Sequence, residues 1–284
     1  MEPEPMDEAE LRRYRLHRRF DRMGRLVGDD AMEKLLRSHV AVLGLGGVGS
    51  WTAEALARAG VGRLTLMDFD DICVTNANRQ LHALADTAGR KKAAVMGERL
   101  RGVNPEAEVR VLERFYDAES SAEIFSLAPD FVVDAIDSIG AKCHLLAACR
   151  ERGVPVVAAT GSGGRLDPSS VRISDLSETA ADPLARDLRR ILREKHGFPE
   201  AEGAPFGIPA VWSPEPPRPP VELHYDGGKG FRCVCPGKED SPFTCDSRRR
   251  IYGSAGFVTG AFGLACASVA VRRLLGEWPS SPLV

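Results

Sequence analysis

The sequence predicts an α/β protein with a Rossmann-like, doubly wound and mostly parallel sheet and a C-terminal extension. Three observations support this fold class. Short apolar runs alternate with longer helical patterns up to about residue 160, as in a parallel sheet covered on both faces. A glycine-rich turn, Gly44 to Gly49, joins the first apolar run to the first of these helices. Acidic residues follow two later runs, at Asp68 and Asp137.

The elements of this sheet follow one another in regular order. An apolar run begins each unit, and the first helix is alanine-rich and ends at Gly60. The expected strands are 39–43, 64–67, 109–112, 131–133 and 154–158. The expected helices are 48–59, one within 89–102, and 138–152.

The two ends of the chain differ from this core. Residues 1–10 carry five carboxylates, and a run of arginines follows at once. We expect a mobile acidic and basic N-terminal segment over 1–18, whose basic part belongs to a first helix. The ATP-binding core is then 19–160, and 161–284 is a C-terminal part for substrate binding and dimerisation.

In the C-terminal part, the regular alternation of strand and helix patterns ends. We expect a strand at 171–173 and an amphipathic helix at 184–195, whose arginines face solvent or a polyanion. Eight of the 22 residues over 199–220 are proline, which predicts a linker or an extended loop. Residues 225–228 resemble a hairpin turn. The uncharged stretch 253–271 has glycines at spacings of three and four, which favours a buried helix over a membrane span.

Composition limits the classes of protein. A net charge of −2 excludes a globally basic nucleic-acid binder but leaves room for a local basic patch. No secretory signal is expected, since residues 1–10 are polar and acidic. Seven cysteines in a chain of this type predict no disulfide framework. We therefore expect a cytoplasmic protein without a membrane segment, in which Cys73, Cys143, Cys149 and Cys266 are core residues.

The glycine turn predicts a phosphate-binding site. Gly44, Gly46 and Gly49 have the spacing of the dinucleotide fingerprint, and Asp68 ends the next strand, where it can bind a ribose hydroxyl. This pattern alone does not separate NAD from ATP. Triphosphate chemistry additionally needs cations, which Arg79 and Lys92 offer. It also needs a carboxylate for Mg²⁺, for which Asp137 is the candidate, although an aspartate there could instead cap the following helix.

Together these residues resemble the ubiquitin-activating-type adenylating enzymes. The resemblance rests on the glycine turn, Asp68-x-Asp70, Asn76-x-x-Arg79-Gln80, Lys92 and Asp134-x-x-Asp137. It implies that Asp68 binds ribose, that Arg79 and Lys92 act on the triphosphate and that Asp137 holds Mg²⁺. An arginine lent across a homodimer is also implied. The ATP site would then comprise Gly44, Gly46, Gly47, Gly49, Asp68, Asp70, Asn76, Arg79, Lys92 and, from the second subunit, Arg22 or Arg25.

Within that superfamily, the chain is most similar to the tRNA threonylcarbamoyladenosine dehydratases, from about Arg19 to Leu275. The more specific motifs are Thr75-Asn76-x-Asn78-Arg79-Gln80-x-His82 and Asp182-Pro183-Leu184. The resemblance implies adenylation of the threonine carboxylate of the modified adenosine beside the anticodon, followed by ring closure with loss of water. Two alternatives stay open, namely adenylation of the C-terminus of a ubiquitin-like or sulfur-carrier protein, and an NAD-dependent oxidoreductase.

A cysteine loop departs from the superfamily pattern. Cys233, Cys235 and Cys245 give three thiols, one fewer than a structural zinc site normally uses. Cys245 is the candidate for a catalytic thiol, because related enzymes form thioester or persulfide intermediates. A cysteine-desulfurase or sulfur-relay partner would then be needed. A structural loop cysteine and a metal ligand are the other interpretations.

Overall fold

The computed structural model describes residues 7–201, 203–224 and 252–277, which form seven strands and nine α-helices. The strands are β1 (His39–Leu43), β2 (Arg63–Met67), β3 (Glu108–Leu112), β4 (Phe131–Asp134), β5 (Val156–Ala159), β6 (Arg172–Asp175) and β7 (Pro209–Trp212). The helices are α1 (Glu8–Arg19), α2 (Asp21–Val27), α3 (Asp29–Arg37), α4 (Gly49–Arg58), α5 (Lys92–Val103), α6 (Ala118–Ser126), α7 (Ile139–Arg152), α8 (Pro183–His196) and α9 (Gly256–Leu275).

All seven strands belong to one sheet, in the order β3-β2-β1-β4-β5-β7-β6. Every neighbouring pair is parallel except β6 with β7. The chain therefore winds outward in both directions from β1 and β4, which confirms the predicted fold class. The division expected after residue 160 falls between β5 and β7, two neighbours in this sheet.

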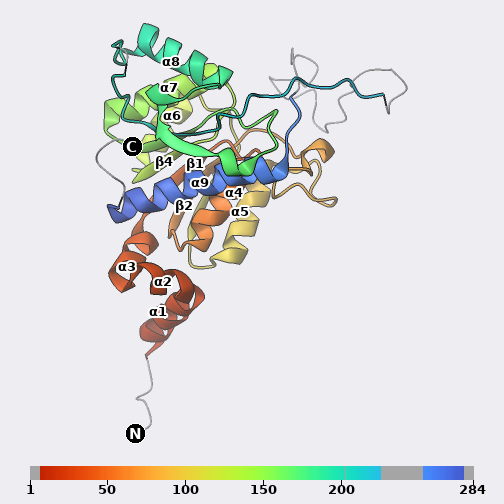
Figure 1. Ribbon diagram of the computed structural model, residues 1–284. Helices are drawn as coiled ribbons and strands as arrows, with labels where there is room; N and C mark the ends of the chain where they lie inside the picture. Colours follow the sequence, from red (N-terminus) through yellow and green to blue (C-terminus); the bar gives the residue numbers. More distant parts are fainter. Residues whose placement is uncertain (1–6, 202, 225–251, 278–284) are drawn as a thin grey trace.

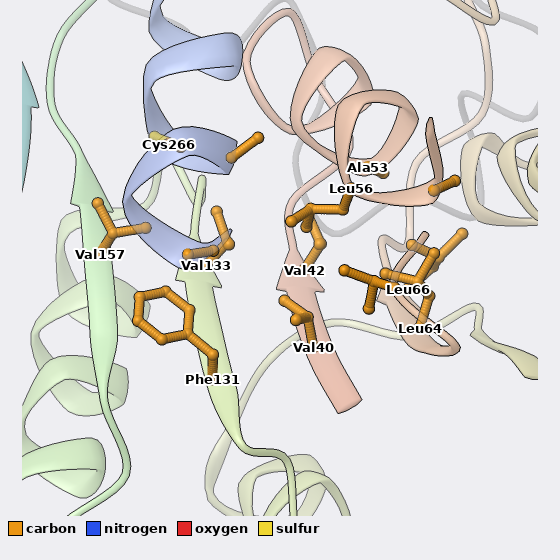
Figure 2. Close-up of a cluster of buried hydrophobic side chains, with 14 of the residues drawn as sticks. Val40, Val42, Ala53, Leu56, Leu64, Leu66, Phe131, Val133, Val157 and Cys266 are labelled. Carbon is orange, nitrogen blue, oxygen red and sulfur yellow. The ribbon is translucent and has the colours of Figure 1, made fainter. Parts of the chain in front are cut away.

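Helices cover both faces of the sheet because its central strands are apolar on both sides. Figure 1 shows α6, α7 and α8 on one face and α4, α5 and α9 on the other. Val40 and Val42 of β1 point into the core beneath α4 and α9, where Figure 2 shows them near Leu56. Ala41 and Leu43 of the same strand belong to the core on the opposite face. Both faces are thus buried, as parallel sheets require.

Strand β7 corrects the prediction of an extended loop over 199–220. Its four residues are buried between β5 and β6, and Pro209 occupies the first position of the strand. A proline is tolerated there because the ladder loses only a terminal donor. The high proline content concealed a run of three residues, Ala210 to Trp212, that is apolar enough to enter the sheet.

Helix α9 confirms the helix expected near 253–271. It is the one helix in the described part of the chain that is long and apolar enough to cross a membrane, and 56% of its most apolar stretch is buried in the protein. Its closest neighbour is α4. A side-chain carbon at Gly263 would lie 2.5 Å from the Val48 carbonyl oxygen, so only glycine allows this approach.

The three N-terminal helices lie at the amino ends of the strands. Helix α3 ends one residue before β1 begins, and Leu36 of α3 contacts the turn at Gly62 that precedes β2. Figure 1 shows these three helices at the lower end of the molecule. The basic run forms two helices rather than the one predicted, because it continues from α1, which begins at Glu8, into α2, where Arg22 and Arg25 lie.

Candidate active site

The loop between β1 and α4 depends on two glycines. Gly44 has a φ of +86°, and a side-chain carbon there would lie 2.6 Å from the Ala135 carbonyl oxygen. A side-chain carbon at Gly49 would lie 1.8 Å from the carbonyl oxygen of Gly44. Gly46 differs, because the nearest described atom is Nε2 of Gln80 at 4.0 Å. The loop is thus closed on its protein side and has space at Gly46, beside the first turn of α4, where an anion can approach backbone N–H groups.

Asp68 ties this loop to the end of β2. Its Oδ2 accepts a hydrogen bond from the Leu45 N–H at 2.6 Å, and its Oδ1 accepts one from the Asp70 N–H at 2.9 Å. Burial raises the pKa of the Asp68 carboxyl, and Lys92 and these backbone donors act in the opposite direction. Each oxygen keeps acceptor capacity, so the carboxylate can still receive ribose hydroxyls.

Lys92 is the buried cation of the site. It begins α5, and its Nζ lies 2.6 Å from Oδ2 of Asp70 with the lysine side chain only 8% exposed. Burial opposes the charged form, yet the carboxylates of Asp68, Asp70 and Asp137 outweigh it and raise the pKa of Lys92. The ammonium is therefore charged at neutral pH. It lies within electrostatic reach of three of the carboxylates predicted for the site.

Arg79 lies on the other side of the glycine loop. A side-chain carbon at Gly47 would lie 3.2 Å from Cγ of Arg79, so the arginine stem packs on the loop. Its Nη1 donates to the Thr75 carbonyl and to Oδ1 of Asn78, both at 3.0 Å. The backbone of Arg79 is held as well, because the indole of Trp51 donates to its carbonyl at 3.1 Å.

Asn76 has a structural contact within the same segment. It is buried, and its Oδ1 accepts a hydrogen bond from the Cys73 N–H at 2.9 Å, which closes the turn that leads to Arg79. The sequence predicted that Asn76 lines the nucleotide pocket. The structure buries Asn76 in the segment that leads to Arg79. Because its side-chain oxygen is used within the turn, a contact with the nucleotide would have to come from the side-chain amide nitrogen.

Asp137 is exposed between β4 and α7. The N-cap of α7 is Ser138, so the alternative role of Asp137 as the helix cap is not observed. Asp134, the first aspartate of the motif, is fully buried and pairs with Lys142 at 2.8 Å. Asp134 is thereby occupied as an ion-pair partner, and Asp137 is the carboxylate of this motif that lies on the exposed side of the turn.

Lys142 is a residue of the site that could not be selected from the sequence. It is fully buried, and its Nζ also donates to the carbonyl oxygens of Asp134 at 3.2 Å and Ile136 at 3.1 Å. These contacts fix the backbone that leads to Asp137. A lysine one turn into an apolar helix offers no sequence signal, because its role exists only through a partner on another element.

Two further buried polar groups lie near the glycine loop. Neither ring nitrogen of His82 has a hydrogen-bond partner among the described residues, and the same holds for Oε1 of Gln80. Burial, with a smaller contribution from Lys92, lowers the pKa of His82 to about 3, so the ring is neutral. The sequence named both residues as part of a family motif without assigning either a role.

The structure does not bring Arg22 and Arg25 into this site. Both lie on α2, at the amino ends of the strands, and Arg25 pairs with Asp21 at 3.0 Å. The glycine loop and Asp68 lie at the carboxyl ends, a strand length of roughly 16 Å away. A contribution of either arginine to an ATP site of the same chain is therefore excluded.

The cysteine predictions divide into two groups. Cys73, Cys143, Cys149 and Cys266 are buried, as predicted for core residues. Burial raises the pKa of Cys143 to about 11 and of Cys266 to about 12, so neither is a reactive thiolate at neutral pH. Cys233, Cys235 and Cys245 lie outside the described residues, as does the hairpin turn predicted at 225–228.

The assembled groups fit a nucleoside triphosphate. An open glycine loop at a helix start offers N–H donors, Asp68 offers a ribose acceptor, and Lys92 and Arg79 flank the loop with positive charge. In the described part of the chain no cluster of three or more histidine, cysteine or acidic side chains could hold a metal by itself. Mg²⁺ does not need one, because it is commonly held by one or two carboxylates together with phosphate oxygens.

Comparison with known proteins agrees with this geometry. The model of the ThiF family matches residues 20–283. The chain is 39% identical to the tRNA threonylcarbamoyladenosine dehydratase of Escherichia coli (strain K12) over 259 residues, which cover 91% of this chain and 94% of the relative. It is 43% identical to the dehydratase of the same name from Haemophilus influenzae, over 90% and 93% of the two chains.

A solved structure extends the likeness to three dimensions. The E. coli dehydratase in complex with ATP superposes with a TM-score of 0.79 at 36% identity, covering 96% of this chain and 98% of that one. Sequence and fold are therefore alike over nearly the whole length of both proteins. The chain belongs to the ThiF family and, within it, to the tRNA threonylcarbamoyladenosine dehydratases.

Proposed function

We propose that this protein catalyses the ATP-dependent dehydration of threonylcarbamoyladenosine in tRNA, at the position next to the anticodon. The observation that carries the proposal is the joint placement of Asp68, Lys92 and Asp137 around an open glycine loop. This set occurs in a chain that aligns with dehydratases over nine-tenths of its length. An NAD-dependent enzyme would have no use for the buried Lys92 or for Asp137.

Two successive substitutions make up the reaction. A carboxylate oxygen of the threonine attacks the α-phosphorus of ATP, and pyrophosphate leaves. The carbamoyl nitrogen or oxygen of the same side chain then attacks the acyl carbon and displaces AMP, and in either case a carbamoyl N–H loses its proton. The product therefore lacks one water relative to the substrate. Adenylation is needed because oxide is a very poor leaving group, and proximity within one side chain supplies much of the remaining rate.

The residues of the chain have separate roles in this proposal. Asp68 holds the ribose, and Lys92 and Arg79 offset the charge that builds on the departing pyrophosphate. Asp137 would hold Mg²⁺, which supplies further charge neutralisation at the phosphates. Lys142 is a positioning residue, because it contacts the backbone before Asp137 but not the reacting groups. Ring closure needs no nucleophile from the protein.

Further proposals concern the partners of this reaction. The protein is proposed to act in the cytoplasm as a homodimer, with Arg22 or Arg25 of one subunit reaching the ATP of the other. Cys245 is proposed as a functional thiol that acts with a cysteine-desulfurase or sulfur-relay partner, in a step separate from ring closure.

The decisive experiment uses tRNA that lacks the cyclic form of the nucleoside. After incubation with the protein, ATP and Mg²⁺, mass spectrometry should show that the modified nucleoside has lost one water and that AMP has appeared in equal amount. ATP–pyrophosphate exchange is measured in parallel with tRNA, with a carrier protein, and with neither. Unchanged nucleoside together with rapid exchange on a carrier protein would assign the chain to carrier activation instead.

A further inference from the structure

The outward face of α8 concentrates positive charge. The chain as a whole carries a net charge of −2, yet the fourteen residues of α8 include four arginines and a lysine against two acids. The apolar side of the helix is used in packing, since Leu188 and Leu192 are buried in the core. Figure 1 shows α8 on the outer side of α7, so its basic face points away from the sheet. The basic residues are Arg186, Arg189, Arg190, Arg193 and Lys195.

In the part of the chain that the structure describes, the arginines of α8 form no ion pair with another element. Arg186 and Arg190 pair only within the helix, with Asp187 at 3.5 Å and Glu194 at 2.9 Å. The other two donate to carbonyl oxygens rather than to carboxylates, Arg189 to Thr179 at 2.7 Å and Arg193 to Pro199 at 3.1 Å. Within the described ranges, no carboxylate of a different element lies within 4.0 Å of these four guanidinium groups.

The second basic helix, α1, makes a useful contrast. Arg12 pairs with Glu106 and Arg13 pairs with Glu33, so each arginine ties α1 to another part of the chain. These ion pairs account for two of the arginines of α1.

In α8, Arg189 and Arg193 bond to carbonyl groups of other segments, and Arg193 also lies over the Phe206 ring at 5.1 Å. Arg186 and Arg190 differ, because the ion pairs observed for them in the described ranges lie within the helix.

A hollow of about 430 Å³ lies on this face of α8. The four arginines line it together with Glu194 and Glu200. Burial and the neighbouring Arg193 lower the pKa of Arg189, and Arg186 adds to the effect. The guanidinium groups therefore repel one another, and a bound anion would relieve that repulsion.

The position of α8 connects this face to the active site. Asp182 caps the helix by accepting from the Ala185 N–H, and it also accepts from the Gly161 N–H, both at 2.9 Å. Gly161 follows β5, the neighbour of the strand that leads to Asp137. Helix α8 thus begins beside the carboxyl ends of the strands, where the nucleotide site lies. From Arg186 to Arg193 it spans about 10 Å, more than a single phosphate group occupies.

We propose that this face of α8 binds the sugar–phosphate backbone of the tRNA whose modified adenosine enters the active site. The inference rests on the proposed function and adds the surface that holds the substrate. Guanidinium groups bind phosphate oxygens in pairs through their planar fork, which favours arginine over lysine for such a surface. Backbone contacts of this kind position a nucleic acid without selecting its sequence.

The test removes two exposed charges from α8. The variant Arg186→Gln/Arg190→Gln keeps the apolar face and the two arginines that bond to carbonyl groups. Its affinity for tRNA carrying threonylcarbamoyladenosine is measured over a range of salt concentrations. We expect binding about tenfold weaker at low salt, with a salt slope smaller by about 2, since each lost phosphate contact reduces the slope by about 1. Affinity for ATP without tRNA should equal that of the wild type.

The matched control is Arg12→Gln/Arg13→Gln, which removes the same charge from α1. It should leave the salt slope unchanged. An equal loss in the control would overturn the inference, because the effect would then reflect total charge. An α8 variant that binds tRNA as tightly as the wild type would also overturn the inference. The proposed function would still stand in that case, provided that the wild type dehydrates tRNA normally. Failure of the wild type to bind or dehydrate tRNA would count against the proposed function itself.

Discussion

Asp137 is the residue at which the metal assignment can be tested most directly. The change Asp137→Asn keeps the size of the side chain but removes the negative charge that Mg²⁺ requires. We expect AMP release from ATP and tRNA to fall at least 100-fold at saturating Mg²⁺, with the thermal unfolding temperature unchanged within about 2 °C, as a surface substitution should behave. Near-normal turnover would show that the metal is held elsewhere.

Lys142 is expected to stabilise the fold through its ion pair with Asp134 and to support activity through its contact with the Ile136 carbonyl. Two variants can separate these contributions. Lys142→Met leaves Asp134 buried without a partner, which should lower the free energy of unfolding by about 3–5 kcal/mol in urea titrations. The double variant Asp134→Leu/Lys142→Met removes both charges and should recover most of that loss. It should not recover activity, because the contact of Lys142 with the Ile136 carbonyl is still missing. Full activity in the double variant would remove Lys142 from its positioning role.

His82 should make the free energy of unfolding measurably dependent on pH. Its pKa is about 3 in the fold and about 6.5 in an unfolded chain, so the unfolded state binds more protons below pH 6.5. The stability that the neutral ring contributes is present above pH 6.5 and is lost as the pH falls toward 3. For this one group the loss is about 2 kcal/mol between pH 7.5 and pH 5.

The variant His82→Leu isolates that contribution. Leucine has a similar volume and leaves no ring nitrogen without a partner, so the protein should still fold at pH 8. Unfolding by urea at several pH values should show a flatter dependence than in the wild type. An identical slope in the two proteins would mean that His82 is not the group responsible.

The residues of the site were predictable from sequence to different degrees. The glycine turn and Asp68 directly follow strand ends, and Lys92 begins α5, so the order of the elements is enough to bring them together. Lys142 was not predictable, because a buried lysine is identified only by the carboxylate and carbonyl groups that surround it. The position of Arg22 relative to the site also depends on which end of the sheet α2 covers, and local sequence does not specify that.

At the scale of elements, the packing of α9 on α4 decides how firmly the glycine loop is held. A side-chain carbon at Gly263 would lie 2.5 Å from the Val48 carbonyl oxygen and 2.7 Å from Cβ of Trp51. Gly263→Ala should therefore push the two helices apart and destabilise the protein by about 1–3 kcal/mol. The affinity for ATP should fall with it, because α4 begins at the glycine loop. Urea unfolding and isothermal titration measure the two effects.

Gly260→Ala is the matched control on the same helix. The nearest atoms to a side-chain carbon there belong to Trp51 and lie at 3.6 Å, which is ordinary contact. Alanine also favours a helix over glycine by about 1 kcal/mol. This variant should be as stable as the wild type or slightly more so. Equal destabilisation of both variants would indicate a general intolerance of α9 rather than the close approach at Gly263.

The elements that the sequence predicted well are those with a continuous apolar run or a clear helical face. Strands β1, β2 and β4 and helices α4, α7 and α8 appear within a few residues of their expected bounds. Strand β7 was missed because proline content is a local signal, whereas the burial of Pro209–Trp212 depends on pairing with β5 and β6. Helix α6 was missed as well, since its nine residues include only a few apolar side chains.

At the scale of the whole molecule, the proposed arginine at the ATP site requires a second copy of the chain, because α2 lies at the amino ends of the strands. If Arg22 or Arg25 contacts ATP, it must come from a second copy. Chains carrying Arg22→Ala, or Arg25→Ala, would be inactive, as would chains carrying Asp137→Asn. Mixed dimers of the two kinds contain one site with neither lesion and should regain up to about half of wild-type activity per dimer, on the symmetry of a twofold pair.

The mixing experiment needs heterodimers that have been purified through two different affinity tags. Homodimers of each variant, treated in the same way, serve as controls. Verified heterodimers that stay inactive would rule out the lent arginine. A protein that sediments as a monomer at assay concentrations and is fully active would rule out the shared site.

The contact between α4 and α9 also has a consequence for how the protein is made. The hydroxyl of Thr52 donates to the Gly263 carbonyl at 3.0 Å, across 211 residues of chain. A pairing so distant in sequence slows folding, because the intervening chain must be ordered first. On the ribosome, the helix that supports the glycine loop therefore waits for its partner until α9 has been synthesised. Nascent chains should acquire the ability to bind ATP only after α9 has emerged and packed on α4.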